Sequence, residues 1–190
     1  MAGKTVIDIS EDFTIPLPVY IIARLMGIPE DRAEDFKRWS DALTGTSEAA
    51  SLEERLPDIM EMATYFGSLI PERRENPGDD LISKVVQAEV DGVGISDEDI
   101  VGFNILLLIA GNETTTNLLS NLLNHLADHP EKWDELRDNP DKIEAAVEET
   151  LRFDGPVHWV NRKATADTEF HGQKVKAGDI VYAILGAANR

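Results

Sequence analysis

The sequence predicts a mostly α-helical fold that ends in a small antiparallel β-sheet. Helical spacing of apolar residues runs through most of the 190-residue chain. One stretch, residues 97–127, predicts a single helix of about thirty residues, longer than most globular helices. From Gly155-Pro156 onward, β-branched runs alternate with turn residues, a pattern typical of short strands. We therefore expect a single partial domain with a helical part, 1–154, and a β-hairpin region, 155–190.

Four shorter helices are expected before the long one. Gly27 and Pro29 stop the first, and Ser51 with Glu54 forms a capping box that opens the third. Pro71 lacks the amide proton that a helix interior needs, so we expect it to kink this third helix or end it early. The expected helices cover 16–26, 31–43, 51 to about 71, and 79–88.

Two helices and two main strands are expected after the long helix. The helices cover about 131–137 and 141–153, with Pro140 at a first-turn position. The strands cover about 157–164 and 179–185. Between them, residues 170–173 and 176–179 are rich in turn formers, which predicts short hairpin strands there.

Composition excludes several classes of function. Thirty-six acidic against eighteen basic residues give a net charge of −18, which argues against binding to nucleic acid or anionic membrane surfaces. The absence of cysteine excludes disulfides, thiolate metal sites and a cysteine nucleophile. No apolar run has the length of a membrane span and no signal segment follows Met1, so a soluble cytoplasmic protein is expected.

The long helix holds the most informative segment. Apolar residues cover every side of it around 100–110, which predicts burial on all sides. Residues 111–117, all small or polar, then interrupt the apolar pattern, and their glycine, asparagines and threonines are poor helix formers. Gly111 lets a flat group approach the backbone, while Ala110 and Thr114 lie on one face. Glu113, beside a hydroxyl, can relay protons.

The same segment can also be explained without any function, by structural hydrogen bonds alone. Threonine hydroxyls can bond back to carbonyls four residues earlier, and Glu113 can pair with a basic side chain. Seven small or polar residues in a row favour the functional interpretation, because breaks in local rules concentrate at functional sites.

Several motifs resemble one family. Ala110-Gly111-Asn112-Glu113-Thr114-Thr115 resembles the oxygen-activating signature of the cytochrome P-450 haem monooxygenases, and Glu149-Thr150-Leu151-Arg152 resembles their Glu-x-x-Arg helix. Arg162 stands where the family places an arginine for a haem propionate, and residues 170–179 resemble the hairpin that follows. Residues 21–29 and 76–83 resemble soluble bacterial members, so the likeness extends from about Val6 to Arg190.

The resemblance implies roles for individual residues. Ala110 and Gly111 would admit haem b (iron protoporphyrin IX) and dioxygen to the long helix. Thr114 would hold a water or the dioxygen, and Glu113 would supply protons. Arg162 would pair with a haem carboxylate, whose geometry its planar guanidinium matches. The substrate pocket would be lined by Leu106, Ile109, Val157, His158 and Val160.

On sequence alone, Glu149 and Arg152 are most simply an exposed acid–base pair three residues apart on a helix. The resemblance instead implies that this ion pair is buried and structural. A second arginine, beyond Arg190, would complete it in the family, so we expect Arg152 to be a buried charge short of a partner in this chain.

One departure from the family limits these expectations. The family's iron ligand is a cysteine thiolate, and this chain has no cysteine and thus no metal ligand of that kind. We expect a central fragment that lacks both family termini and neither turns over nor binds haem stably. Its parent would insert one oxygen atom from O2 into a small organic substrate, with electrons from a ferredoxin or flavodoxin. The alternative is a non-catalytic, haem-free helical binding protein derived from that family.

Overall fold

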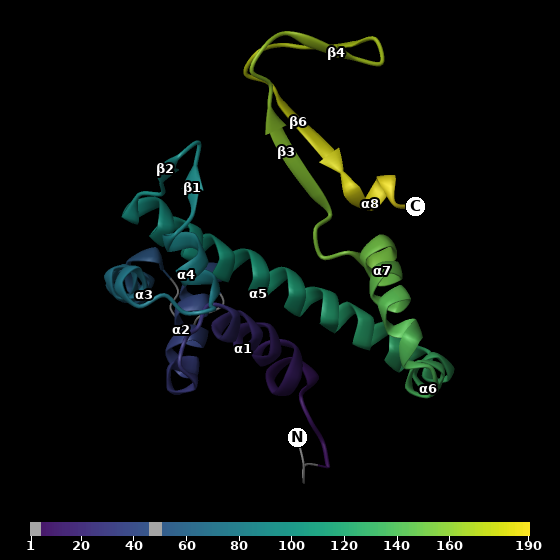
Figure 1. Ribbon diagram of the computed structural model, residues 1–190. Helices are drawn as coiled ribbons and strands as arrows, with labels where there is room; N and C mark the ends of the chain where they lie inside the picture. Colours follow the sequence, from purple (N-terminus) through teal and green to yellow (C-terminus); the bar gives the residue numbers. More distant parts are fainter. Residues whose placement is uncertain (1–4, 46–50) are drawn as a thin grey trace. The chain divides into compact units, whose positions relative to one another are not determined.

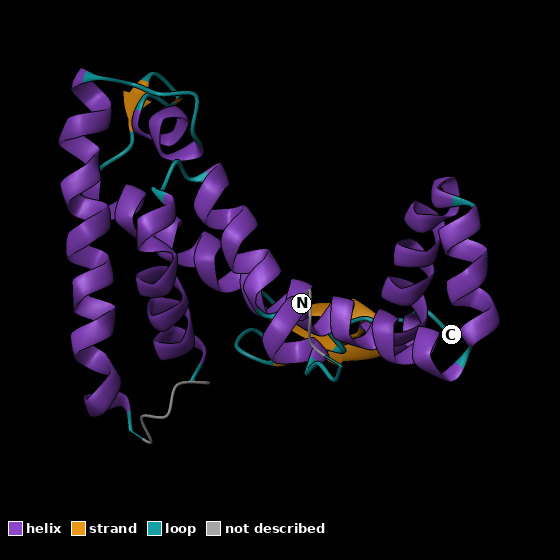
Figure 2. Ribbon diagram, turned by 90° about the horizontal axis from the view of Figure 1, so that it is seen from below, coloured by secondary structure: helices purple, strands orange, loops and turns teal. Residues whose placement is uncertain are grey.

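The structure is a computed structural model that describes residues 5–45 and 51–190. Figure 1 follows its elements along the chain, and Figure 2 shows that helices dominate while strands form short paired segments. The α-helices are α1 (Pro16–Leu25), α2 (Ala33–Thr44), α3 (Leu52–Glu75), α4 (Leu81–Val86), α5 (Asp97–Asp128), α6 (Pro130–Asp138), α7 (Ile143–Asp154) and α8 (Leu185–Ala188). Short π or 3₁₀ turns are η1 (Ser10–Thr14), η2 (Glu30–Arg32) and η3 (Pro140–Lys142). The predicted class, mostly helical with small antiparallel sheets, is confirmed.

The six strands form three two-stranded antiparallel sheets. The strands are β1 (Glu89–Val90), β2 (Val93–Gly94), β3 (Trp159–Lys163), β4 (Thr168–Phe170), β5 (Gln173–Val175) and β6 (Ile180–Ile184). β1 pairs with β2, β3 with β6 and β4 with β5. The β1–β2 turn uses Asp91 and Gly92, both at positive φ, as a tight two-residue hairpin requires. These two strands lie between the fourth expected helix and the long helix, where no strand was expected.

The chain forms two compact units, one extending to Thr116 and the other covering Asn117–Arg190. The division falls inside α5, whereas the chain's character changes from helix to strand only after Asp154. No helix among the described residues is long and apolar enough to cross a membrane.

The core of the first unit lies between α1, α2, α3, α4 and the first half of α5 (Figure 1). Phe36 of α2 and Phe66 of α3 meet edge to face, with ring centroids 5.9 Å apart. Trp39 packs against Phe36 and against Tyr65 of α3, with centroid separations of 5.7 and 5.2 Å. Burial of large aromatic rings supplies much of the apolar stabilisation of such a core.

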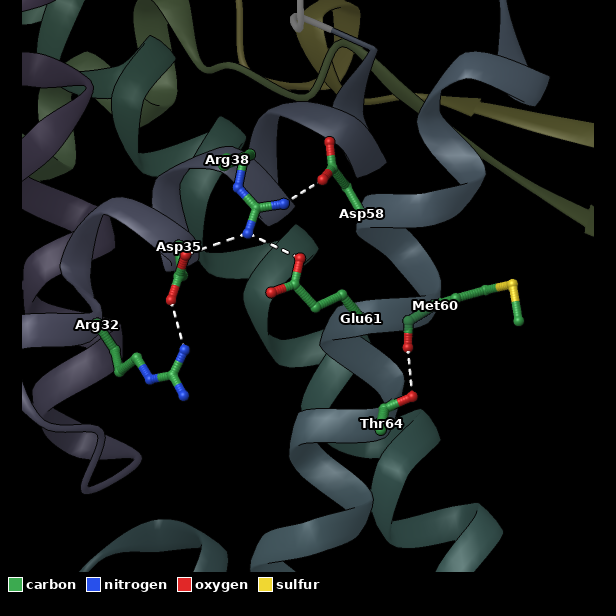
Figure 3. Close-up of polar contacts among 7 residues, drawn as sticks. All are labelled: Arg32, Asp35, Arg38, Asp58, Met60, Glu61 and Thr64. Atoms are coloured by element: carbon green, nitrogen blue, oxygen red, sulfur yellow. Dashed lines mark hydrogen bonds and ion pairs between the residues drawn. The ribbon is translucent and has the colours of Figure 1, made fainter.

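Ion pairs at the surface also join α2 to α3. Arg38 of α2 donates to Asp58 and Glu61 of α3 and to Asp35 of its own helix, as Figure 3 shows. Asp35 also accepts from Arg32 at 2.7 Å. These hydrogen bonds, that to Arg32 first, hold the pKa of Asp35 below its ordinary value.

The third helix begins as predicted and ends later than predicted. Ser51 and Glu54 form the capping box with each other's backbone amides. Pro57 and Pro71 both lie inside the helix, which continues to Glu75. Of the two outcomes expected at Pro71, a kink or an early end, the early end is wrong. The last turn is held by its own contacts: Ile70 is fully buried, Arg73 donates to the carbonyl of Gly27, and Arg74 pairs with Asp97.

The long helix is buried on one side only in the first unit. Its buried residues are Ile100, Asn104, Leu108 and Asn112, a stripe with a spacing of four. On the other side Leu106 is 61% exposed. The expectation of burial on every side was therefore wrong for this chain, because only one face of α5 meets the core of α1–α4.

Candidate functional site

The exposed side of α5 carries the predicted site residues of the first unit. Leu106, Ala110 and Glu113 recur at spacings of four and three, which places them on one helix face. All three are exposed, and Ile109 beside them is half-buried. The structure thus brings these four residues together on an uncovered stripe of α5, opposite the buried stripe.

Thr114 bonds to its own helix. Its Oγ1 donates to the carbonyl of Ala110 at 2.6 Å, the back-bond that the structural explanation of this segment requires. The hydroxyl has donated its one proton, but its oxygen still has lone pairs that can accept a hydrogen bond from a ligand or water. Both the structural bond and a binding role are therefore compatible with this geometry.

Glu113 has no ion-pair partner among the described residues, and its carboxylate is exposed. The basic partner that the structural explanation also requires is absent from residues 5–45 and 51–190. A solvent-exposed carboxylate one residue before a hydroxyl can exchange protons with water and pass them along the helix.

Gly111 faces protein rather than open space. A Cβ built at Gly111 would lie 2.6 Å from Cδ1 of Ile22 in α1, closer than such atoms pack. The expectation that Gly111 opens space for a flat group needs correction: here its missing side chain permits the close approach of α1. Ala110, next to it on the exposed side, leaves the open backbone surface.

Two further residues of the polar segment contact the first unit's core. The side-chain amide of Asn112 donates to the hydroxyl of Ser40 in α2, and both side chains are buried. The hydroxyl of Thr116 donates to the carbonyl of Thr14 at 3.1 Å. Neither contact was predicted from the sequence. The one pattern that pointed to Asn112 is its position four residues after Leu108, where a polar residue continues an apolar helix face.

Arg162 lies on β3, in the second unit. Alternation along the strand places it on the same face as Val160, and its cross-strand partner is Val181 of β6. Its Nη1 donates only to the carbonyl of the neighbouring Asn161 at 2.7 Å. No carboxylate pairs with it in the part of the chain that the structure describes, so its guanidinium is available to an anion.

A pocket of about 500 Å³ lies beside this arginine within the second unit. Its lining combines the cation with apolar side chains, among them Phe170, Val181 and Ala183. A second cation, Lys163, and one carboxylate, Asp167, also line the pocket, so its charged lining is positive by one. Two cations beside an apolar wall suit a ligand with a carboxylate on an apolar body.

Val157 and His158 line a different pocket of the second unit, with a volume of about 270 Å³. Phe153 and Gly186 also line it. Val160, the third predicted wall residue, is half-buried in β3 and pairs with Ala183. The second unit therefore groups Val160 with Arg162 and places Val157 and His158 at the end of α7.

Glu149 and Arg152 form a two-contact ion pair on α7, with both distances at 2.7 Å. Their side chains are 61% and 47% exposed, and Arg152 also donates to the carbonyl of Asn189. The expectation of a buried Arg152 short of a partner was wrong: its side chain is half-exposed, and the Asn189 carbonyl is a second acceptor beside Glu149. The bond to Arg152 lowers the pKa of Glu149.

A His–Asp contact was also missed. Nε2 of His125 in α5 lies 2.9 Å from Oδ2 of Asp154, and Asn121 donates to the Asp154 carbonyl at 2.7 Å. The sequence analysis had no means to pair residues 29 positions apart. These contacts tie the ends of α5 and α7 together within the second unit.

Each unit, taken by itself, carries groups that could contact a flat, carboxylated cofactor. The first supplies an uncovered helix surface at Ala110 with a hydroxyl at Thr114, and the second supplies an unpaired Arg162. No group of His, Asp or Glu among the described residues could itself hold a metal ion, and the chain has no cysteine. The residues fit the binding of such a cofactor but do not include a ligand for an iron within it.

Comparisons with known proteins agree on one family. The family model of cytochrome P450 matches residues 50–190. YjiB of Bacillus subtilis, named as a cytochrome P450, is 43% identical over 99% of this chain and 49% of its own length. Erythromycin C-12 hydroxylase of Saccharopolyspora erythraea is 40% identical over 100% of this chain and 49% of its own.

A solved structure gives the same result. CYP109E1 from Bacillus megaterium in complex with testosterone has a TM-score of 0.85 and 41% identity over 97% of this chain and 50% of its own. The chain spans about half the length of the curated relatives it matches.

Proposed function

The chain belongs to the cytochrome P450 family, and on that premise we propose that it forms the oxygen-side part of a haem monooxygenase. The parent enzyme inserts one atom of O2 into an organic substrate. One observation carries the proposal: Ala110, Glu113 and Thr114, in the order of the family's signature, lie on or beside the uncovered face of α5.

Haem, when bound, supplies the redox chemistry that activates dioxygen. Ala110 leaves the backbone of α5 accessible to its flat surface, and Arg162 pairs with one of its carboxylates. The guanidinium suits this role because its planar fork of N–H donors matches a carboxylate.

Thr114 and Glu113 manage protons at that surface. The Thr114 hydroxyl exchanges its bond to the Ala110 carbonyl for one to a water or ligand oxygen, and its own oxygen accepts in turn. Glu113, exposed and unpaired among the described residues, takes protons from solvent and delivers them toward that hydroxyl.

Leu106 and Ile109, beside Ala110 on α5, and Val157, His158 and Val160, in the second unit, line the substrate pocket in this proposal. Four of these five side chains are apolar, which favours an apolar substrate. CYP109E1 was solved with testosterone and corticosterone, and EryK with erythromycin B. We propose an apolar organic substrate of steroid or macrolide size.

We also propose a compartment, a cofactor and an electron donor for the parent enzyme. The parent works in the cytoplasm with haem b and takes electrons from a ferredoxin or flavodoxin. Without a cysteine, the 190-residue chain has no thiolate for the iron, so by itself it is inactive and does not hold haem stably. No finding supports the alternative of a haem-free binding protein.

Haem retention by the parent protein tests the proposal. Arg162→Leu removes the unpaired cation and should reduce the haem retained after gel filtration several-fold. Lys174→Leu, which removes an exposed cation from β5, is the matched control and should retain haem like the unchanged protein. The reduced carbonyl complex of the unchanged parent should show the red-shifted Soret band of thiolate ligation. A parent that binds no haem, or equal haem loss in both variants, would contradict the proposal.

A further inference from the structure

The polar segment of α5 contacts the first unit at three positions on its inner side. Gly111 packs against Ile22 of α1, Asn112 donates to Ser40 of α2, and Thr116 donates to the carbonyl of Thr14. These three anchoring contacts span little more than one helical turn. Ala110, Glu113 and Thr114, the residues proposed to serve the reaction, belong to the same stretch of α5.

The hydrogen bond of Asn112 is the central one of these contacts. Asn112 lies on the side of α5 opposite Ala110 and Thr114. Successive residues of an α-helix are about 100° apart, so Asn112 is turned by about 200° from both Ala110 and Thr114. A bond that fixes the direction of Asn112 therefore fixes the direction in which Ala110 and Thr114 face. Apolar contacts alone allow a helix to rotate or slide, whereas a hydrogen bond is directional.

Asn112 is also energetically unusual for its place. It continues the buried stripe of Ile100, Asn104 and Leu108, where leucine would suit the surroundings. Its Oδ1 is buried without a partner among the described residues, which is unfavourable. Asn104, in the same stripe, is also buried, with both of its side-chain polar atoms unpartnered among the described residues, so the hydrogen bond to Ser40 is what distinguishes Asn112.

We infer that Asn112 is a positioning residue: through its hydrogen bond to Ser40 it sets the rotation of α5 and aims Ala110, Glu113 and Thr114 outward. The anchoring contact stands on the structure alone. Its consequence for the reaction rests on the proposed function.

Hydrogen exchange of the 190-residue chain tests the contact without any cofactor. Ser40→Ala removes only a hydroxyl from α2, yet it should raise amide exchange several-fold in peptides covering 110–116 of α5. Asn112→Leu should do the same, and the double variant should exchange no faster than Asn112→Leu alone. Asn124→Leu makes the same change at an exposed position of α5 and should leave 110–116 unaltered.

Two results would overturn the inference: amide exchange that rises only within α2 in Ser40→Ala, or increases in exchange from the two substitutions that add in the double variant. Neither result depends on the proposed function. Ser40→Ala keeps the test decisive even if Asn112→Leu fails to fold, because it deletes a single oxygen atom.

A second measurement separates positioning from structure alone. In the parent, Ser40→Ala should raise the share of reducing equivalents released as peroxide several-fold, at unchanged haem content and KM. If Thr114→Ala produces this change and Ser40→Ala does not, Asn112 is structural only and the inference fails. If Thr114→Ala itself produces no change, the proposed function fails, while the hydrogen-exchange result still decides the anchoring contact.

Discussion

At the scale of single residues, Gly111 shows how closely α1 and α5 approach each other. Its absent side chain leaves room for Ile22, a buried residue of the first unit. Glycine is about 1 kcal/mol less favourable than alanine inside a helix, so its presence in mid-helix needs a reason. Close packing on Ile22 supplies one without reference to any ligand.

A double-mutant cycle of Gly111→Ala and Ile22→Val tests whether Gly111 packs closely on Ile22. Gly111→Ala gains about 1 kcal/mol of helix propensity but overpacks Ile22, which costs about 1–3 kcal/mol, so the net change should be destabilising. Ile22→Val removes the Cδ1 atom that the new methyl group would meet. In that background Gly111→Ala should become neutral or stabilising.

The free energies of unfolding of the four proteins, from urea titrations followed by circular dichroism, give the coupling. A Gly111→Ala substitution that stabilises both backgrounds equally would show that the contact with Ile22 is not close in solution.

The site itself was accessible to sequence reasoning only in part. The order Ala110, Glu113, Thr114 is a local pattern, and its resemblance to the family's signature suggested an oxygen site. The contacts of Asn112 with Ser40 and of Thr116 with Thr14 join residues 72 and 102 positions apart. No local pattern encodes such pairs, because they arise only when η1, α2 and α5 pack together.

At the scale of elements, Glu135 joins α6 to η3, the turn that leads directly into α7. Its carboxylate accepts from Lys142 at 2.7 Å and from Lys132 at 3.0 Å. These two bonds, that to Lys142 first, lower the pKa of Glu135 to about 2. The folded state thus favours the ionised carboxylate more than the unfolded chain does.

The sign of the pH dependence follows from this lowered pKa. The stabilisation is fully present above the ordinary glutamate pKa, which is 4.5, and is lost as the pH falls toward about 2. An NMR titration of the Glu135 side chain should give a midpoint near the lowered value. Lys142→Met should raise the pKa of Glu135 more than Lys132→Met does, and equal effects would contradict the ranking of the two lysines.

Element boundaries were predictable where local chemistry decides them. Ser51 with Glu54, and Gly27 at φ 70°, begin and end helices as the sequence indicated. Pro71 did not end α3, because the buried Ile70 and the contacts of Arg73 and Arg74 continue the helix for four more residues. The one-sided burial of α5 was equally unpredictable, since an apolar sequence does not say which neighbours are present.

At the scale of the whole molecule, the described chain leaves large apolar side chains uncovered. Trp159 and Tyr182 contact each other on one face of the β3–β6 sheet and are 51% and 54% exposed. Phe103 and Leu106 are exposed on α5. Clusters of exposed apolar side chains are typical of surfaces that another segment or molecule covers.

The isolated chain should therefore bind a hydrophobic dye and associate. Titration with 1-anilinonaphthalene-8-sulfonate should show strong fluorescence in native buffer, and sedimentation velocity should show species heavier than the 21.0 kDa monomer. Trp159→Lys should reduce both signals. A monomer with a sharp cooperative transition and no dye binding would favour a self-contained binding protein.

In the proposed function, α5 directs protons at the oxygen site of a monooxygenase, and the coupling of the parent enzyme reports on this role. Thr114→Ala keeps the helix and removes the hydroxyl, while Thr115→Ala makes the same change one residue away. A substrate selected by its spectral shift from a panel of steroids and macrolides serves for both, and product formed per reduced cofactor consumed is measured. Thr114→Ala should continue to consume electrons while product falls several-fold and peroxide rises, and Thr115→Ala should remain coupled. Unchanged coupling in Thr114→Ala would contradict the account, because α5 would then be only a wall of the pocket.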